Sequence, residues 1–179
     1  ATTGTVSFTP TDDSIYDATS NETATISING VSGKTGVAEN GTPQAVTITI
    51  TDDESAPTVT LTSNSYTMAE DAGGYHTLRA SLSVATYEDV TVSIDGTGGT
   101  ATEGTDFGTV SDITISAGNT LGTTTFTATD DNVYEGNETA GISVSGVSGG
   151  GASESGSQAV TITITENESA PTVTLSTSG

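Results

Sequence analysis

The amino-acid sequence predicts an all-β fold made of tandem antiparallel β-sandwich domains. Three observations lead to this prediction. Apolar residues alternate with Thr or Ser in short runs, no run has the spacing of an amphipathic helix, and the chain repeats itself at a period of about 115 residues. Alternation with period two is typical of strands that bury one face. A period of this length fits whole domains rather than the short units of solenoids or propellers.

The internal repeat defines the expected domain boundaries. Residues 126–139 resemble residues 8–17 followed by residues 21–23, with Tyr134 at the position of Tyr16. Residues 158–165 are identical to residues 44–51, and residues 169–175 are identical to residues 55–61. We therefore expect a complete repeat over residues 56–169. Residues 1–55 form the C-terminal half of a preceding repeat, and residues 170–179 form the first strand of a following one.

Seven strands are expected in the complete repeat, each with apolar residues on one face and Thr or Ser on the other. Glycine-rich joints at residues 73–74, 96–99, 118 and 149–151 separate several of them. Seven short strands with frequent turns are typical of an antiparallel β-sandwich. The apolar positions, strand by strand, are Val59 and Leu61; Leu78, Ala80, Leu82 and Val84; Val90, Val92 and Ile94; Ile113 and Ile115; Phe126 and Ala128; Ala140, Ile142 and Val144; and Val160, Ile162 and Ile164.

The half-repeat carries the counterparts of the last three strands, expected around residues 6–8, 24–28 and 46–50. Three strands make a poor core and leave an unpaired edge. We therefore expect missing strands to come from the same polypeptide or, by strand addition, from a neighbouring subunit, which would give a head-to-tail filament. The short Ser-Ala-Pro joint between repeats favours a semi-rigid rod.

Composition narrows the class of partner. The chain has 179 residues, with 2 Lys and Arg against 23 Asp and Glu, and a formal net charge of −21. This charge argues against nucleic acid or an anionic membrane as partner, because both require basic side chains. It favours a divalent cation, although acidic residues also keep a protein soluble. The chain has no Cys and no stretch of the ~20 apolar residues that a membrane span needs. Its Thr, Ser, Gly and Asn content resembles that of bacterial cell-surface repeat proteins.

Acidic residues of the complete repeat gather where strands end. Because the expected strands alternate in direction, the end of the fifth strand, the start of the sixth and the end of the seventh meet at one tip of the sandwich, within reach of two further loops. So many carboxylates repel one another unless a cation neutralises them. The residues expected at this tip are Glu70, Asp106, Asp130, Asp131, Glu135, Glu138, Glu166 and Glu168, together with Asn167.

Oxygen donors of this kind favour calcium (Ca2+), which takes 6–8 oxygen ligands in flexible geometry. The scarcity of nitrogen and sulfur donors weighs against zinc and copper. Magnesium stays open as an alternative, although it prefers water-rich octahedral sites. In a chain without disulfides, such a metal site can supply the staple that holds a thin core together.

The acidic run at residues 130–138 (Asp-Asp-Asn-Val-Tyr-Glu-Gly-Asn-Glu) resembles the Asp-Asp-x-x-x-Glu-x-x-Glu pattern of the Calx-beta family. Residues 101–107 resemble a second stretch of the same family, and Glu166-Asn167-Glu168 stands where the family often has consecutive aspartates. The family includes regulatory domains of sodium/calcium exchangers and repeats of large bacterial surface proteins. The resemblance implies an immunoglobulin-like sandwich that binds calcium through Glu70, Asp106, Asp130, Asp131, Glu135 and Glu138, with the Val133 carbonyl.

The half-repeat has matching positions, so the resemblance implies a second site there. Its turn carries two extra residues before the last acidic position. The candidate ligands are Asp12, Asp13, the Ile15 carbonyl, Asp17, Glu22, Asp52, Asp53 and Glu54.

These observations predict a structural segment of a long secreted or cell-surface repeat protein, such as an adhesin stalk, filament or matrix component, rigidified by calcium at its domain tips. The alternative is a calcium-sensing regulatory module. An enzyme is not expected, because the chain has one His, no Cys, no phosphate-binding loop and no reason for a deep pocket. The expected partners are calcium ions and neighbouring repeats or subunits, at an extracellular or cell-surface location, in a bacterium.

Overall fold

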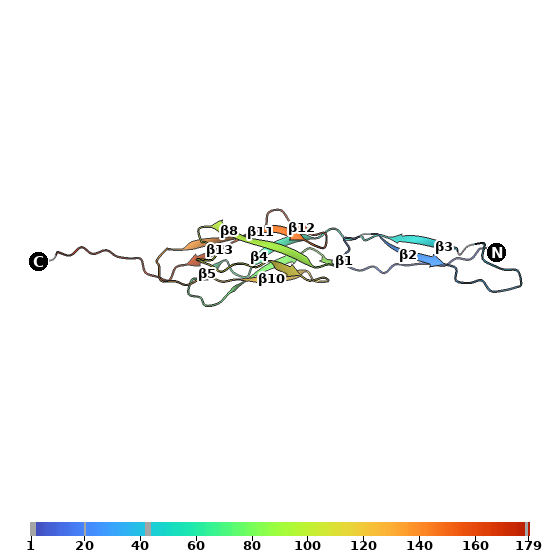
Figure 1. Cartoon of the computed structure of the whole chain (residues 1–179), viewed down its shortest axis with the longest axis horizontal. Coiled ribbons are helices and arrows are strands. Elements are labelled where there is room, and N and C mark those ends of the chain that lie inside the picture. Colours follow the sequence, from blue (N-terminus) through green and yellow to red (C-terminus); the bar gives the residue numbers. More distant parts are fainter. Residues whose placement is uncertain (1–2, 20, 42–43, 178) are drawn as a thin grey trace.

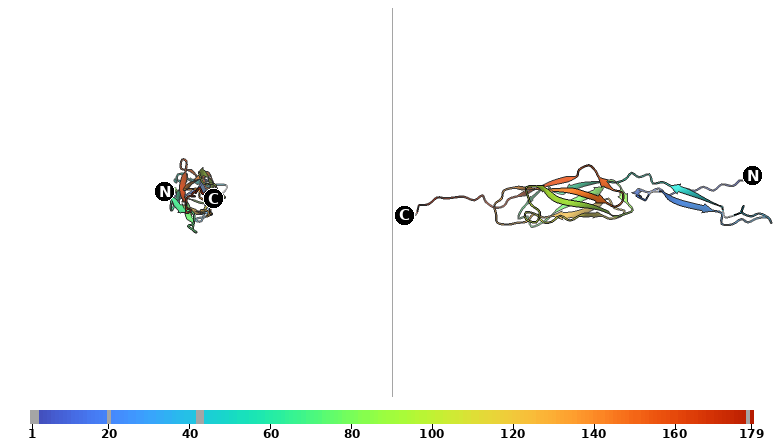
Figure 2. Two further views of the ribbon diagram at one scale, coloured as in Figure 1. Left: turned by 90° about the vertical axis from the view of Figure 1, so that its left-hand side faces the viewer. Right: turned by 45° about the horizontal axis from the view of Figure 1, so that its top comes forward.

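The structure is a computed structural model that describes residues 3–19, 21–41, 44–177 and 179. Within these residues the chain forms strands β1 to β13 and no helix, so no helix could span a membrane. The molecule is elongated, with the β2–β3 hairpin at one end, a sandwich in the middle and residues 169–177 extending from the other end (Figure 1). Figure 2 shows the same rod along its axis and from a second side.

Two sheets form the sandwich, which confirms the predicted all-β fold. Neighbouring strands are antiparallel, except that the short edge strands β12 and β5 pair in parallel with β4 and β13. The first sheet has the order β10 (Leu121–Phe126), β6 (His76–Leu82), β4 (Thr58–Ser63) and β12 (Ser153–Glu154). The second has the order β5 (Thr67–Ala69), β13 (Ala159–Thr165), β11 (Glu138–Ser148), β8 (Val90–Gly99) and β9 (Ile113–Ile115).

The core lies between the two sheets and comes from residues 59–164 alone. Period-two alternation places Val59 and Leu61 of β4 inside and Thr60 outside, as expected for strands with one buried face. The register between β11 and β13 sets Ala140 beside Ile162 and Ile142 beside Val160, so the buried positions face the same side. The rings of Phe107 and Phe126 stack with centroids 5.2 Å apart. The complete repeat therefore carries its own hydrophobic core.

Three predicted strands differ from the observed ones. The fifth strand covers Leu121–Phe126 instead of centring on residues 126–128, and Ala128 makes only an isolated bridge with Phe107. No strand forms over residues 6–8 or 172–175, where Val173 and Leu175 are 98% and 100% exposed. A strand is stable only when a neighbour satisfies its backbone hydrogen bonds, and no described segment pairs with either of these.

The half-repeat forms a two-stranded hairpin rather than three strands. Strand β2 (Glu22–Ser27) pairs antiparallel with β3 (Ala45–Ile50), from Glu22 opposite Ile50 to Ser27 opposite Ala45. One face of this hairpin and residues 6–10 line an open groove of about 830 Å³. The apolar side chains that line it include Val6, Phe8, Ile26, Ile28, Val46, Ile48 and Ile50.

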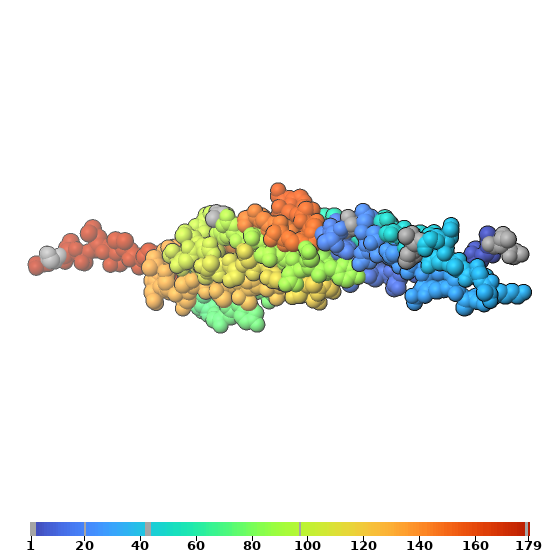
Figure 3. Space-filling view, turned by 45° about the vertical axis from the view of Figure 1, so that its right-hand side comes forward, coloured from blue at the N-terminus to red at the C-terminus, as the bar shows by residue number. Residues whose placement is uncertain are grey.

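The half-repeat is joined to the sandwich by direct contacts as well as by the chain. Strand β1 (Ile15–Tyr16) pairs in parallel with β7 (Ala85–Thr86) at the base of the sandwich, the end opposite residues 166–168. The Tyr87 hydroxyl donates a hydrogen bond of 2.6 Å to Asp13. Gly151 has φ of +62°, and a Cβ built there would lie 2.8 Å from Cε1 of Tyr16. Figure 3 shows the two surfaces in contact, and we call this contact the junction.

Phe107→Ala should test how far the stability depends on the core of the complete repeat. Phe107 is fully buried against Phe126, so we expect a loss of about 3–5 kcal/mol in the free energy of unfolding. Denaturant titration of the metal-free chain measures this loss. The matched control, Tyr75→Ala, removes a ring that is 64% exposed and should change the stability by less than about 1 kcal/mol. Equal losses would contradict the assignment of the core.

Gly151→Ala should loosen the junction without unfolding the sandwich. The new Cβ would clash with Tyr16, so we expect faster hydrogen exchange over residues 12–19 and a broader distribution of molecular lengths in small-angle scattering. Gly156→Ala is the matched control: Gly156 has φ of +67°, yet nothing lies within 4 Å of its Cβ position. Both variants cost about 1–2 kcal/mol of backbone strain. A junction that loosens equally in both variants would show that the Tyr16 contact does not hold it.

Candidate metal centre

Four segments meet at the tip of the sandwich from which residues 169–177 leave (Figure 1). Strands β5 and β13 run in parallel and end together, because the Glu70 backbone N–H donates to the Thr165 carbonyl at 3.1 Å. Strand β11 begins at the same level, with Glu138 opposite Ile164. The loop after β10 is tied to the loop after β8, because Thr129 N–H donates to the Asp106 carbonyl at 2.9 Å. Sheet direction therefore brings the acidic loops together.

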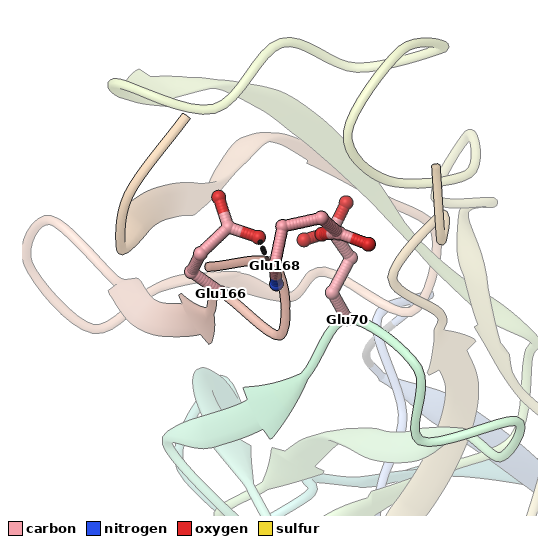
Figure 4. Close-up of side chains that lie close together, drawn as sticks. All are labelled: Glu70, Glu166 and Glu168. Atoms are coloured by element: carbon pink, nitrogen blue, oxygen red, sulfur yellow. Dashed lines mark hydrogen bonds between the residues drawn. The ribbon is translucent and has the colours of Figure 1, made fainter. Parts of the chain in front are cut away.

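The first group of carboxylates consists of Glu70, Glu166 and Glu168. One oxygen from each lies within 4.8 Å of the others, and all three side chains are half-buried. Figure 4 shows the carboxylates of Glu70 and Glu168 close together, with Glu166 bonded to the backbone of Glu168. Glu166 Oε2 also accepts the backbone N–H groups of Glu135 and Gly136, at 2.6 and 2.8 Å. Glu166 is thus fixed in place by the loop that carries the second group.

The second group consists of Asp106, Glu135 and Glu138, whose oxygens satisfy the same 4.8 Å criterion. Asp106 is oriented by the Thr102 backbone N–H, which donates to Oδ2 at 2.6 Å. Glu138 opens β11 and Glu135 precedes it in the loop, so one strand end supplies two of the three carboxylates. Each group can offer three carboxylates to one cation.

Asp130 and Asp131 lie beside these groups without belonging to either. Asp130 Oδ1 accepts the Asn167 side-chain N–H at 3.3 Å, and Asp131 Oδ1 accepts the Val133 backbone N–H at 2.6 Å. Their charges act on the groups. Asp131 raises the pKa of Glu135, after desolvation and the charge of Asp106, and Asp130 adds to the rise in the pKa of Glu168 that the hydrogen bond with Glu166 begins. All eight predicted carboxylates of the complete repeat therefore meet at one tip.

The pKa values show how crowded these charges are. A hydrogen bond shared with Glu166, followed by desolvation and the charges of Glu166 and Glu70, raises the pKa of Glu168 to about 7. The N–H groups of Glu168, Glu135 and Gly136, together with the side chain of Glu168, lower the pKa of Glu166 to about 2. Desolvation, followed by neighbouring carboxylates, raises the pKa of Glu70, Glu135 and Glu138. Glu168 therefore keeps a proton close to neutral pH, and a cation can replace that proton.

An unpartnered oxygen shows that the tip suits a hard cation. Oε2 of Glu168 is buried and has no hydrogen-bond partner within the described part of the chain. A buried carboxylate oxygen without a partner is costly unless a proton or a cation satisfies it. With oxygen donors alone and three carboxylates in each group, the tip matches the ligand preference of calcium.

In the half-repeat, all eight candidate ligands line one cavity of about 240 Å³: Asp12, Asp13, Ile15, Asp17, Glu22, Asp52, Asp53 and Glu54. Its hydrogen bonds follow the pattern of the complete tip. Ile15 N–H donates to Asp13 at 2.9 Å, and Asp17 N–H donates to Asp52 at 3.2 Å. Among the described residues, no three of these carboxylates converge within 4.8 Å as the two groups above do. This cavity is thus a more open version of the same site.

Two residues at these sites escaped prediction from the sequence. Tyr87 belongs to the complete repeat, yet it lines the cavity of the half-repeat and donates to Asp13. This bond lowers the pKa of Asp13 and raises that of Tyr87 to about 12. Asn137 accepts the Glu166 backbone N–H at 3.0 Å. The position of Asn137 inside the acidic run could have indicated its role at the tip. Nothing near Tyr87 in the sequence indicates that it contacts the half-repeat.

Comparison with solved structures shows the same fold. A structure described as CBD12 from CALX1.2 is 23% identical, with a TM-score of 0.52, over 60% of this chain and 43% of that chain. A structure described as the apo form of the Calx CBD1 domain is 22% identical, with a TM-score of 0.51, over 63% of this chain and 99% of that chain. The match thus spans less than half the length of the first of these proteins.

No curated protein matches the chain as a relative. The family model of the Calx-beta domain matches residues 52–168, which include both strand β4 and the acidic tip. This stretch makes up most of the chain and coincides with the sandwich and its carboxylate groups. The chain therefore belongs to the Calx-beta domain family.

Proposed function

We propose that this chain is a structural segment of a long repeat protein, stiffened by calcium bound at the tips of its Calx-beta domains. Adhesin stalks, filaments and matrix components on the surface of bacteria are proteins of this kind. In this proposal residues 56–169 are one complete repeat, residues 1–55 are the second half of the preceding repeat, and residues 170–179 open the next. The carboxylates bind a cation and carry out no catalysis.

One observation carries the proposal: the acidic cavity of the half-repeat lies at the junction with the next repeat. Tyr87 of the complete repeat lines this cavity and donates to Asp13, one of its candidate ligands. Strand β1, which pairs with β7, lies between the candidate ligands Asp13 and Asp17. Loops that bind the cation and loops that join the repeats are therefore the same loops.

Each protein group has a definite part in this arrangement. Glu70 and Glu168 come from segments that are far apart in sequence, so holding both carboxylates ties the end of β5 to the end of β13. Asp106, Glu135 and Glu138 tie the loop after β8 to the start of β11 in the same way. Calcium, when bound, supplies the positive charge that offsets the repulsion among these groups. The expected result is a stiffer tip on an unchanged sandwich.

Affinity separates this proposal from a calcium-sensing regulatory module. A stalk in calcium-rich surroundings works with a dissociation constant of ~10⁻⁴–10⁻³ M, whereas a sensor requires ~10⁻⁷–10⁻⁵ M. Calorimetric titration of the full chain with calcium measures this constant, and scattering in calcium and in chelator measures the change in stiffness. A sensor-range affinity with no change in stiffness would replace the stalk by the regulatory module.

Calcium should raise the melting temperature of the full chain. If it binds only the folded state, a concentration ~1,000 times its dissociation constant adds about 4 kcal/mol to the stability. Glu168→Gln removes a central carboxylate at constant volume, so we expect the calcium affinity to fall at least about tenfold. Asp71→Asn is the control, because Asp71 carries the same charge next to Glu70 but lies outside both groups. Identical melting curves in calcium and in chelator would overturn the proposal.

The metal-free chain should become more stable as the pH falls from about 8 to about 5.5. The pKa of Glu168 is about 7 in the folded state and 4.5 ordinarily, so its contribution is complete below pH 4.5 and is lost as the pH rises through 7. Glu166, with a pKa of about 2, contributes above pH 4.5 and loses this contribution as the pH falls toward 2. Thermal melts in chelator measure the trend, which Glu168→Gln should flatten.

Calcium binding should respond to pH in the opposite direction. Protons and calcium compete for the same carboxylates, so the rise in melting temperature that calcium causes should shrink over the same interval, from pH 8 to pH 5.5. For the metal-free chain, a free energy of unfolding that increases as the pH rises through 7 would contradict the charge distribution described for the tip.

A further inference from the structure

We infer that the edge formed by Val133 and Tyr134, at the tip of the sandwich, is a docking surface for the base of a following Calx-beta repeat. This inference rests on the proposed function, because it assumes that the domain stands in an array. It goes further by naming the surface, the occupant and the contacts between them.

The junction in this structure shows what such docking looks like. Ile15 and Tyr16 of the half-repeat pair in parallel with Ala85 and Thr86 of the complete repeat. The Tyr16 ring fits against Gly151, where a Cβ would lie 2.8 Å from Cε1 and 3.3 Å from the hydroxyl oxygen. The preceding residue, Gly150, is buried against Thr86. A base with two consecutive glycines thus receives the tyrosine of the preceding tip.

The tip of the complete repeat holds its Val-Tyr pair by the same two anchors. Val133 N–H donates to Asp131 at 2.6 Å, as Ile15 N–H donates to Asp13 at 2.9 Å. Glu135 N–H donates to Glu166 at 2.6 Å, matching the bond from Asp17 N–H to Asp52. With the bonds before and after the pair conserved between the two tips, Val133 and Tyr134 are presented as Ile15 and Tyr16 are.

The two pairs differ in how far they are covered. Ile15 and Tyr16 are half-buried and belong to a strand, whereas Val133 is 58% exposed, Tyr134 is 45% exposed and neither belongs to a strand within the described residues. A short apolar edge with an aromatic residue is a site for strand addition. The counterpart at the other tip is covered by a Calx-beta repeat, which identifies the kind of partner.

The chain that leaves the tip specifies the occupant. Residues 169–175 repeat residues 55–61, the segment that leads from the half-repeat into the sandwich docked on it. In that sandwich Pro57 is buried beside the glycine loop, because its carbonyl accepts the Ser153 N–H at 3.1 Å. A following repeat that begins at Ala170, as the complete repeat begins at Ala56, would in the same way bring its base against Tyr134. A second copy of this chain is not the occupant, because its own base is already covered by Tyr16.

The test extends the full chain by one repeat, joining residues 1–169 in frame to a second copy of residues 56–179. The complete repeat carries its own core, so the added copy has the means to fold. Hydrogen exchange over residues 132–137 should become at least about tenfold slower in the extended chain than in the original one. Tyr134→Ala in the extended chain should broaden the scattering-derived length distribution, while the same change in the original chain leaves it unaltered.

Two glycine variants of the added copy show whether the contact is specific. The change corresponding to Gly151→Ala should abolish the slowing, and the change corresponding to Gly156→Ala should preserve it, since both glycines have positive φ but only Gly151 contacts a tyrosine. Equal exchange in the extended and original chains, or slowing that survives Gly151→Ala, would overturn the inference. Slow exchange at residues 132–137 that is already present in the original chain, together with a dimeric mass, would also overturn the inference, because the occupant would then be a second copy.

Running each arm in calcium and in chelator separates this inference from the proposed function. Slowed exchange in a chain that binds no calcium would support docking while the proposal of a calcium-stiffened stalk fails. Calcium binding that stiffens the half-repeat junction without slowing exchange at residues 132–137 would leave that proposal standing and remove the docking surface.

Discussion

Repulsion among carboxylates at strand ends is the constraint on which the tip depends. Six carboxylates converge in two groups of three, and two more lie beside them. With only 2 Lys and Arg against 23 Asp and Glu, the chain has few basic side chains to balance them. Backbone N–H groups stabilise the Glu166 anion, and Glu168 retains a proton to nearly neutral pH. The proposed divalent cation would resolve the remaining repulsion, since it would replace protons with a charge that several loops share.

The hydrophobic core and the acidic tip occupy separate parts of the domain. The buried apolar side chains come from residues 59–164 and lie between the sheets, whereas the acidic loops lie beyond the strand ends. A cation at the tip can therefore change how firmly the loops are held without repacking the core. This separation suits a domain in which the ion controls stiffness.

Strand alternation and strand direction explain how much the sequence could predict. Period-two patterns predict six of the seven main strands of the sandwich at the observed places, and the alternating strand direction predicts the eight carboxylates at one end. The fifth strand was misplaced because Thr123, Thr124 and Thr125 give little apolar contrast. The strands expected at residues 6–8 and 172–175 do not form for a different reason. Both segments have the alternating apolar pattern of a strand, but no described segment forms backbone hydrogen bonds with them as a neighbouring strand would. Tyr87 was missed because its hydrogen bond to Asp13 joins two segments 74 residues apart, and no local pattern around Tyr87 indicates that contact.

The geometry of the junction limits the kind of assembly that is possible in the proposed array of repeats. Its two faces are different: one is an acidic tip with Tyr16, and the other is a base with Gly150, Gly151 and the Tyr87 hydroxyl that donates to Asp13. In such a heterologous contact a tip binds a base, and two identical faces do not bind each other. The contact therefore extends in one direction and does not close a dimer. The short Pro57 linker keeps each base close to the preceding tip, and the β1–β7 pairing fixes its orientation. In the proposed array, such contacts would propagate as a rod whose joints coincide with the acidic cavities.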